Sequence, residues 1–84
     1  MKGDHQQRVP LRPGGRVRIA LTYHWAQGAR GTIVSHRGSP RTVEALGGPI
    51  LFYWVWFDEA QHDADGDGPY VSAEIDARYL ESID

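Results

Sequence analysis

An acidic loop between residues 63 and 74 carries the clearest metal-binding pattern in this sequence. It runs D-A-D-G-D-G-P-Y-V-S-A-E, which matches the calcium-loop pattern D-x-[DN]-x-[DN]-G-x5-E without a gap. Calcium is a hard cation that takes six to eight oxygen ligands. The spacing therefore predicts a calcium site with carboxylate ligands and one backbone carbonyl, contributed by Asp63, Asp65, Asp67, Pro69 and Glu74.

The local chemistry of this loop both supports and limits the calcium prediction. Gly68 stands where the chain must bend sharply, and we expect it to take a positive φ. Val71 occupies a position that usually holds a polar or water-binding residue. An apolar strand is expected before the loop, so the predicted site is strand–loop–helix. The alternative is an acidic turn that is simply solvated.

Aromatic residues form a second candidate site. The run Ile50–Phe57 is apolar, rich in aromatic residues and bounded by breakers, which favours a strand. Only one of its two faces can fill a core, so the other must be covered by the N-terminal tail, a helix, a second copy or a partner. We predict a partner-binding surface that includes aromatic residues of the first long loop: Tyr23, Trp25, Phe52, Trp54 and Trp56. The alternative is that helix and tail cover this face internally.

The remaining pattern predicts a mostly β domain. Arg16–Thr22 alternates apolar and polar residues, which predicts a half-buried strand. Gly28 and Gly31 bracket the entry to a second strand, Gly31–Ser35, and Thr42–Leu46 is a short strand or an extended loop. Ser72 is a candidate cap for a helix over residues 73–79, and Leu80–Ile83 is a further short strand or extended tail. Residues 1–13 are expected to form a flexible tail, and residues 14–84 the folded domain.

Four segments together resemble the SH3-like barrel superfamily: Pro13–Ile19, Gly28–Val34, Tyr53–Phe57 and Tyr79–Glu81. Their order is similar to the barrel domain of the nitrile hydratase β-subunit, to the variable chain of ferredoxin–thioredoxin reductase and to KOW-type domains. The resemblance implies a small barrel of about five strands, here with one short C-terminal helix. It also implies a docking or regulatory module without catalytic groups. The acidic loop is an addition to that pattern.

Composition excludes some classes of function and disfavours others. The chain has no cysteine, which excludes disulfides, thiolate metal sites and cysteine nucleophiles. No apolar run approaches a transmembrane helix, and residues 1–13 lack the apolar segment of a secretory signal, so we expect a cytoplasmic protein. The sequence has neither a serine in a nucleophile motif nor a glycine-rich phosphate loop, so we do not predict an enzyme.

Charge is distributed unevenly along the chain. Residues 1–41 contain seven arginines and one lysine against one acid, and residues 42–84 contain ten acids against one arginine. Folding can interleave these charges or keep them apart, and the formal net charge of −2 gives no electrostatic reason to expect nucleic acid as a ligand. We therefore predict a non-enzymatic, protein-binding module with a calcium site. The alternatives are an accessory subunit of a redox or metalloenzyme complex and an RNA-binding KOW-like barrel; the sequence does not indicate an oligomeric state.

Overall fold

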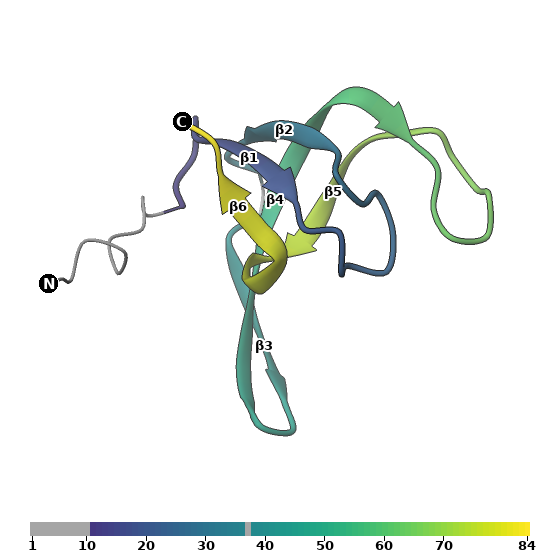
Figure 1. Ribbon diagram of the computed structural model, residues 1–84. Coiled ribbons are helices and arrows are strands. Elements are labelled where there is room, and N and C mark those ends of the chain that lie inside the picture. The colour runs from purple at the N-terminus through teal and green to yellow at the C-terminus, as the bar shows by residue number, and fades with distance from the viewer. Residues whose placement is uncertain (1–10, 37) are drawn as a thin grey trace, which may run out of the picture.

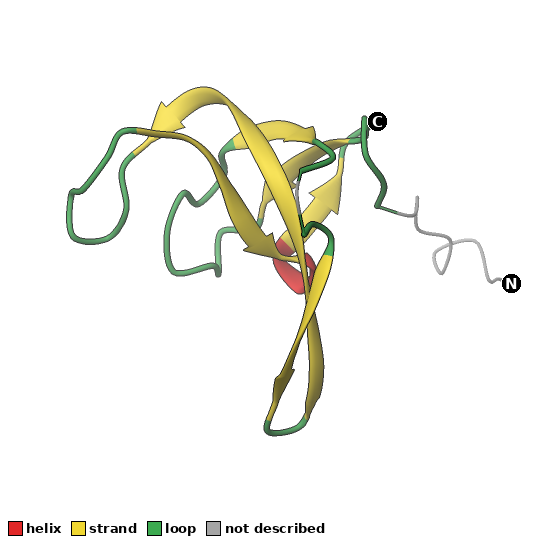
Figure 2. Cartoon of the chain, turned by 180° about the vertical axis from the view of Figure 1, so that it is seen from behind, coloured by secondary structure: helices red, strands yellow, loops and turns green. Residues whose placement is uncertain are grey.

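The computed structural model describes residues 11–36 and 38–84, which form a mostly β structure (Figures 1 and 2). The described residues contain six strands and one 3-10 turn, Ala77–Tyr79. The strands are β1 (Arg16–Ile19), β2 (Arg30–Ile33), β3 (Arg41–Ala45), β4 (Gly48–Gln61), β5 (Tyr70–Asp76) and β6 (Leu80–Ser82). The predicted mostly β class is confirmed.

Strand β4 is the centre of the sheet. It is 14 residues long and pairs antiparallel with β3 through its first part, with β2 through its second part and with β5 along its opposite edge. The sheet order is β3-β4-β2-β1-β6, with β5 paired to β4. Among the described residues this is an open antiparallel sheet, so a closed SH3-like barrel is not confirmed.

The predicted C-terminal helix is wrong. Most of that segment belongs to β5, and only the single 3-10 turn Ala77–Tyr79 follows it. Ile75 and Tyr79 stand at helical spacing, but Ala73 and Ile75 also alternate at the period of a strand, and both pack toward the core. Pairing with the long β4 gives the β5 backbone its hydrogen-bond partners, and this tertiary pairing overrides weak local propensity.

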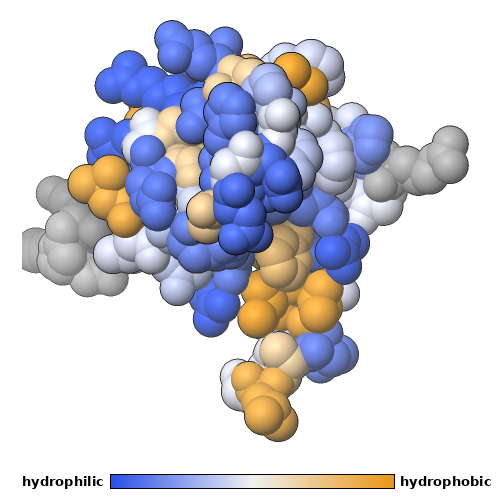
Figure 3. All heavy atoms as spheres, turned by 90° about the vertical axis from the view of Figure 1, so that its right-hand side faces the viewer, coloured by the Kyte–Doolittle hydropathy of each residue, from blue (hydrophilic) through white to orange (hydrophobic). Residues whose placement is uncertain are grey.

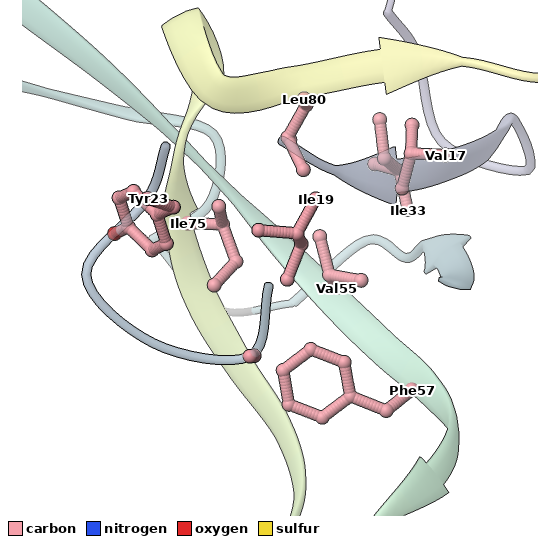
Figure 4. Close-up of a cluster of buried hydrophobic side chains, with 9 residues drawn as sticks. Val17, Ile19, Tyr23, Ile33, Val55, Phe57, Ile75 and Leu80 are labelled. Carbon is pink, nitrogen blue, oxygen red and sulfur yellow. The ribbon is translucent and has the colours of Figure 1, made fainter. Parts of the chain in front are cut away.

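One small apolar core lies between β1, β2, β4 and β5 (Figure 4). Alternate residues of each strand point into it, as the sequence period predicts. Its buried members are Val17, Ile19, Tyr23, Ala26, Ile33, Val55, Phe57, Ile75 and Leu80. Leu11 also packs against this core, and its carbonyl accepts a hydrogen bond from the Tyr53 hydroxyl at 3.1 Å. The predicted tail boundary at residue 13 thus leaves out a packed residue, and residues 1–10 of that tail lie outside the described residues.

Several strand boundaries differ from the expected ones. β1 ends at Ile19, three residues before the predicted end, and β4 begins at Gly48 and continues to Gln61. The predicted chain break near Gly47 and Gly48 is a two-residue turn, Leu46-Gly47, between the paired residues Ala45 and Gly48. Gly47 has φ of 90°, which glycine adopts without steric cost. The turn therefore joins β3 and β4 into one hairpin.

The pairing of β2 with β4 depends on a glycine. A methyl group at Gly31 would overlap the Trp56 carbonyl oxygen and lie 2.8 Å from Val55 Cγ1. We predict that Gly31→Ala lowers the free energy of unfolding by about 3 kcal/mol, because the two strands must separate. Chemical denaturation measures this change.

Gly38→Ala is the matched control for Gly31→Ala. A Cβ at Gly38 meets no atom within 4 Å, and its φ of 77° is the only source of strain. We expect a loss of about 1 kcal/mol there. Equal losses at the two glycines would contradict the close approach of β2 to β4.

Candidate metal centre

The β4–β5 loop is shaped by its first aspartate. The Asp63 N–H donates to the Asp67 carbonyl at 3.0 Å, and the Gly66 N–H donates to the Asp63 carbonyl at 3.0 Å. Asp63 Oδ1 accepts hydrogen bonds from the backbone N–H groups of Asp65, at 3.0 Å, and Asp67, at 2.8 Å. Aspartate commonly organises turns in this way. The side chain at the first position of the motif thus folds the loop around itself.

Three carboxylates converge in this loop. One ligand oxygen from each of Asp63, Asp65 and Asp67 lies within 4.8 Å of the others, and the last two side chains are exposed. Gly68 has φ of 123°, as predicted for the bend, and a Cβ there would meet the Gln61 carbonyl at 3.0 Å. The group is therefore able to hold a metal ion, with the Asp63 Oδ2 lone pairs still largely available.

This triad differs electrostatically from other acids of the chain. Four carboxylates have an arginine partner at 2.6–2.9 Å, in the pairs Arg16–Asp58, Arg18–Glu81, Arg41–Glu74 and Arg78–Asp76. Within residues 11–36 and 38–84, the three loop aspartates have no such ion pair. Two backbone N–H groups donate to Asp63, but no cationic side chain of the described residues offsets the mutual repulsion of the three carboxylates, so the loop is a place where a cation is favoured.

Ion pairing also shows how the uneven sequence charges are arranged. Three of the four pairs join an arginine of the first half to an acid of the second half, so the charges interleave. Hydrogen bonds from the Arg16 guanidinium lower the pKa of Asp58, and those from the Arg78 side chain lower the pKa of Asp76. These arginines are consequently not arranged as a continuous basic face.

Glu74 does not join the loop aspartates. It lies in β5 opposite Trp54, and both of its carboxylate oxygens accept hydrogen bonds from Arg41 Nε at 2.7–2.8 Å. Tyr70 lies four positions earlier in the same extended strand, a span of about 13 Å. The strand that replaces the expected helix carries Glu74 away. Pro69, which is exposed between the triad and β5, stays a predicted carbonyl ligand.

The structure divides the five predicted partner-binding aromatics into separate places. Tyr23 is only 8% exposed and belongs to the core. Trp25 is half-buried, with edge-to-face contacts to Phe57 and Tyr70, each at 5.8 Å between ring centroids. The first long loop therefore contributes one buried ring and one ring beside the acidic loop.

Phe52, Trp54 and Trp56 share one face of β4, as the alternation predicts. This face points outward, away from the core that Val55 and Phe57 fill. The Arg41 guanidinium lies 5.3 Å from the centre of the Phe52 ring, and the His36 ring stacks on Trp54 at 4.4 Å. Trp56 is 55% exposed. Other side chains of the chain thus cover the first two rings in part, and Trp56 remains the open one.

Sequence reasoning missed a projecting surface. β3, the Leu46-Gly47 turn and the first five residues of β4 form a two-stranded ribbon, residues 41–52, that extends away from the core (Figure 1). Leu46 at its turn is fully exposed, and Leu51 is exposed as well. Two extended runs separated by two residues, the second of them glycine, were the signal that would have predicted this hairpin.

Comparisons with protein-family models, with curated proteins and with solved structures found no match to this chain. The SH3-like resemblance consequently stays a prediction. The described part of the chain contains no helix of the length and apolar character needed to cross a membrane.

The hydrogen bonds of Asp63 predict how its variants behave. Asp63→Ala removes the acceptor of two backbone N–H groups, so we expect the amides of Asp65 and Asp67 to exchange with solvent severalfold faster, as measured by NMR. Asp63→Asn keeps a carbonyl acceptor and is expected to retain most of the protection. If the alanine and asparagine variants exchange alike, Asp63 does not organise the loop.

Proposed function

We propose that this chain is a non-enzymatic, protein-binding module whose β4–β5 loop holds a calcium ion. One observation carries the protein-binding part: the ribbon of residues 41–52 stands away from the core with apolar side chains exposed on it. Two further observations support the calcium part: three carboxylates converge, and none of them has an arginine partner within residues 11–36 and 38–84.

The side chains of the ribbon favour a partner. Figure 3 shows hydrophobic residues gathered on the projecting β3–β4 hairpin, below a largely hydrophilic body. The larger apolar side chains of this ribbon are all exposed or half-buried: Val43, Leu46, Ile50, Leu51 and Phe52. An isolated two-stranded hairpin is only marginally stable in water. Burying its apolar side chains against a partner would both stabilise it and remove them from solvent.

The outer edge of β3 favours one kind of partner, an extended segment of another protein. In a hairpin closed by a two-residue turn, Ala45 and Gly48 exchange hydrogen bonds, and such pairs alternate along the ladder. The N–H and C=O groups of Thr42 and Glu44 therefore face away from β4. β3 forms the edge of the sheet among the described residues, where these groups are open to an added strand.

The opposite edge of the ribbon is less suited to strand addition. β5 ends at Asp76, opposite Phe52, so among the described residues β4 has no strand partner on that side before this point. Pro49 lies there and has no N–H to donate. An added strand would thus find more of its hydrogen bonds on β3. If the partner at the β3 edge were bound permanently, the chain would be an accessory subunit of a larger complex. That alternative function would use the same β3 edge.

Calcium fits the loop better than a transition metal does. All three converging ligands are carboxylates, and hard oxygen ligands suit calcium or magnesium. Calcium tolerates irregular geometry and completes its shell with water, whereas magnesium demands a near-ideal octahedron. Because Glu74 is paired with Arg41, the site has fewer protein ligands than the full motif, which favours weak binding.

The edge of β3 is tested with a proline. Peptides selected from a random library against the whole chain should shift the amide signals of Thr42 and Glu44. We expect Thr42→Pro to weaken their binding at least tenfold, because it removes one outward N–H while leaving the hydrogen bonds between β3 and β4 intact. Thr42→Ala keeps that N–H and should bind within about twofold of the wild type.

Two results would contradict strand addition at β3. Selected peptides that map to another surface would show that the ribbon is not the docking site. Equal binding to the proline and alanine variants would show that the β3 backbone is not used. A concentration-dependent dimer with protected Thr42 and Glu44 amides would assign the edge to a second copy instead.

Calcium titration tests the loop. We expect amide shifts confined to residues 63–68 and saturation with a dissociation constant of about 0.1–1 mM or weaker, with a smaller response to magnesium. Asp67→Asn should abolish this response, because it removes one of three carboxylates. Glu74→Gln, which lies outside the triad, should leave it unchanged. If no amide signal shifts at a calcium concentration 20-fold above a dissociation constant of about 1 mM, the calcium assignment is wrong.

A further inference from the structure

A pocket lies where the β1–β2 loop meets the β4–β5 loop. It has a volume of about 360 Å³ and is open to solvent on one side. Its lining residues are His24, Trp25, Asp63, Ala64, Asp65, Tyr70 and Ala73. This volume is near the lower end of the range for organic ligands and far larger than a metal ion needs.

Two aromatic rings form a corner of this pocket. Trp25 and Tyr70 meet edge to face, with an interplanar angle of 79° and 5.8 Å between ring centroids. The other face of the corner is supported from the core, since Trp25 also packs edge to face on the buried Phe57. The corner is therefore held by packing, and its rings line the pocket with π-electron surface.

The charge of the pocket is negative. Asp63 and Asp65 line it, and the described residues contribute no lysine or arginine to its lining. Burial raises the pKa of the Tyr70 hydroxyl, and the charges of Asp63 and Asp67 raise it further. A neutral or anionic ligand would gain little from these groups, whereas a cation gains from both the carboxylates and the rings.

We propose that this pocket binds an organic cation, the ammonium or guanidinium head of a lysine or arginine side chain from a protein partner. The apolar stem of such a side chain would lie along Trp25 and Ala73, and its charged head would face Tyr70 and the carboxylates. An aromatic corner with acidic neighbours matches the two needs of a cation carried on a carbon chain.

This inference rests on the proposed protein-binding function and adds the chemistry of the residue that the partner presents. It also couples that function to the loop, because Asp63 and Asp65 would serve both a calcium ion and the basic side chain. Calcium bound at the triad would neutralise the pocket, so the two cations compete. A partner would accordingly bind more tightly when calcium is absent.

Capped amino acids test the pocket on the whole chain in calcium-free buffer. The probes are N-acetyl methylamides of lysine, Nε-trimethyl-lysine and arginine, with norleucine as the uncharged control. We expect at least one charged probe to give saturable NMR shifts of the Trp25 indole and Tyr70 ring signals, with norleucine at least fivefold weaker. The exposed Trp56 indole should not respond.

Matched variants separate the pocket from the calcium site. Tyr70→Leu keeps an apolar wall but removes the ring, and should weaken the charged probe at least threefold while calcium still binds. Tyr70→Phe should retain probe binding. Asp67→Asn, outside the pocket lining, should lose calcium and keep the probe within about twofold, and Glu59→Gln controls for overall charge.

Several outcomes would overturn the inference without touching the proposed function. Equal binding of norleucine would show a plain apolar pocket. Equal probe binding by Tyr70→Leu and wild type would remove the role of the ring. Binding of tetramethylammonium alone, with no capped amino acid bound, would assign the pocket to a free small cation. Calcium titration and the β3-edge selection retain their own readouts in each case.

Discussion

The pairing of β4 along both of its edges is the constraint on which this structure depends. β2 and β5 flank the second part of β4, and these three strands supply much of the core. The first part of β4 pairs with β3 and extends with it into solvent. The acidic loop and the apolar ribbon consequently lie at opposite ends of one strand (Figure 1). The close approach at Gly31, which no larger residue permits, holds the middle of this arrangement.

The strands that periodicity predicts well are those with one buried face. Val17 and Ile19 in β1, and Val55 and Phe57 in β4, alternate as expected and fill the core. The prediction of a helix over residues 73–79 was wrong because the apolar residues there fit both the helical and the strand period. Pairing with β4 decides between the two. The length of β4 could not be predicted from the sequence either, because the acidic residues Asp58 and Glu59 are more typical of a loop than of a strand.

The candidate site was predictable in its local part only. Asp63, Asp65 and Asp67 come together because the turn that joins them is set by neighbouring residues. The position of Glu74 depends on whether its segment forms a helix or a strand, which pairing with β4 decides. Its partner Arg41 lies 33 residues away in the sequence. Long-range contacts of this kind also place Trp25 against Tyr70, which turned two separate motifs into the walls of one pocket.

Calcium binding by the aspartates of the β4–β5 loop is open to a direct test, a crystal structure of the chain grown with calcium. We expect an ion between Asp63, Asp65 and Asp67 at oxygen distances of about 2.3–2.6 Å, with water completing the shell and Glu74 still paired to Arg41. An ion held by Glu74, or a triad that contains only water at millimolar calcium, would contradict it.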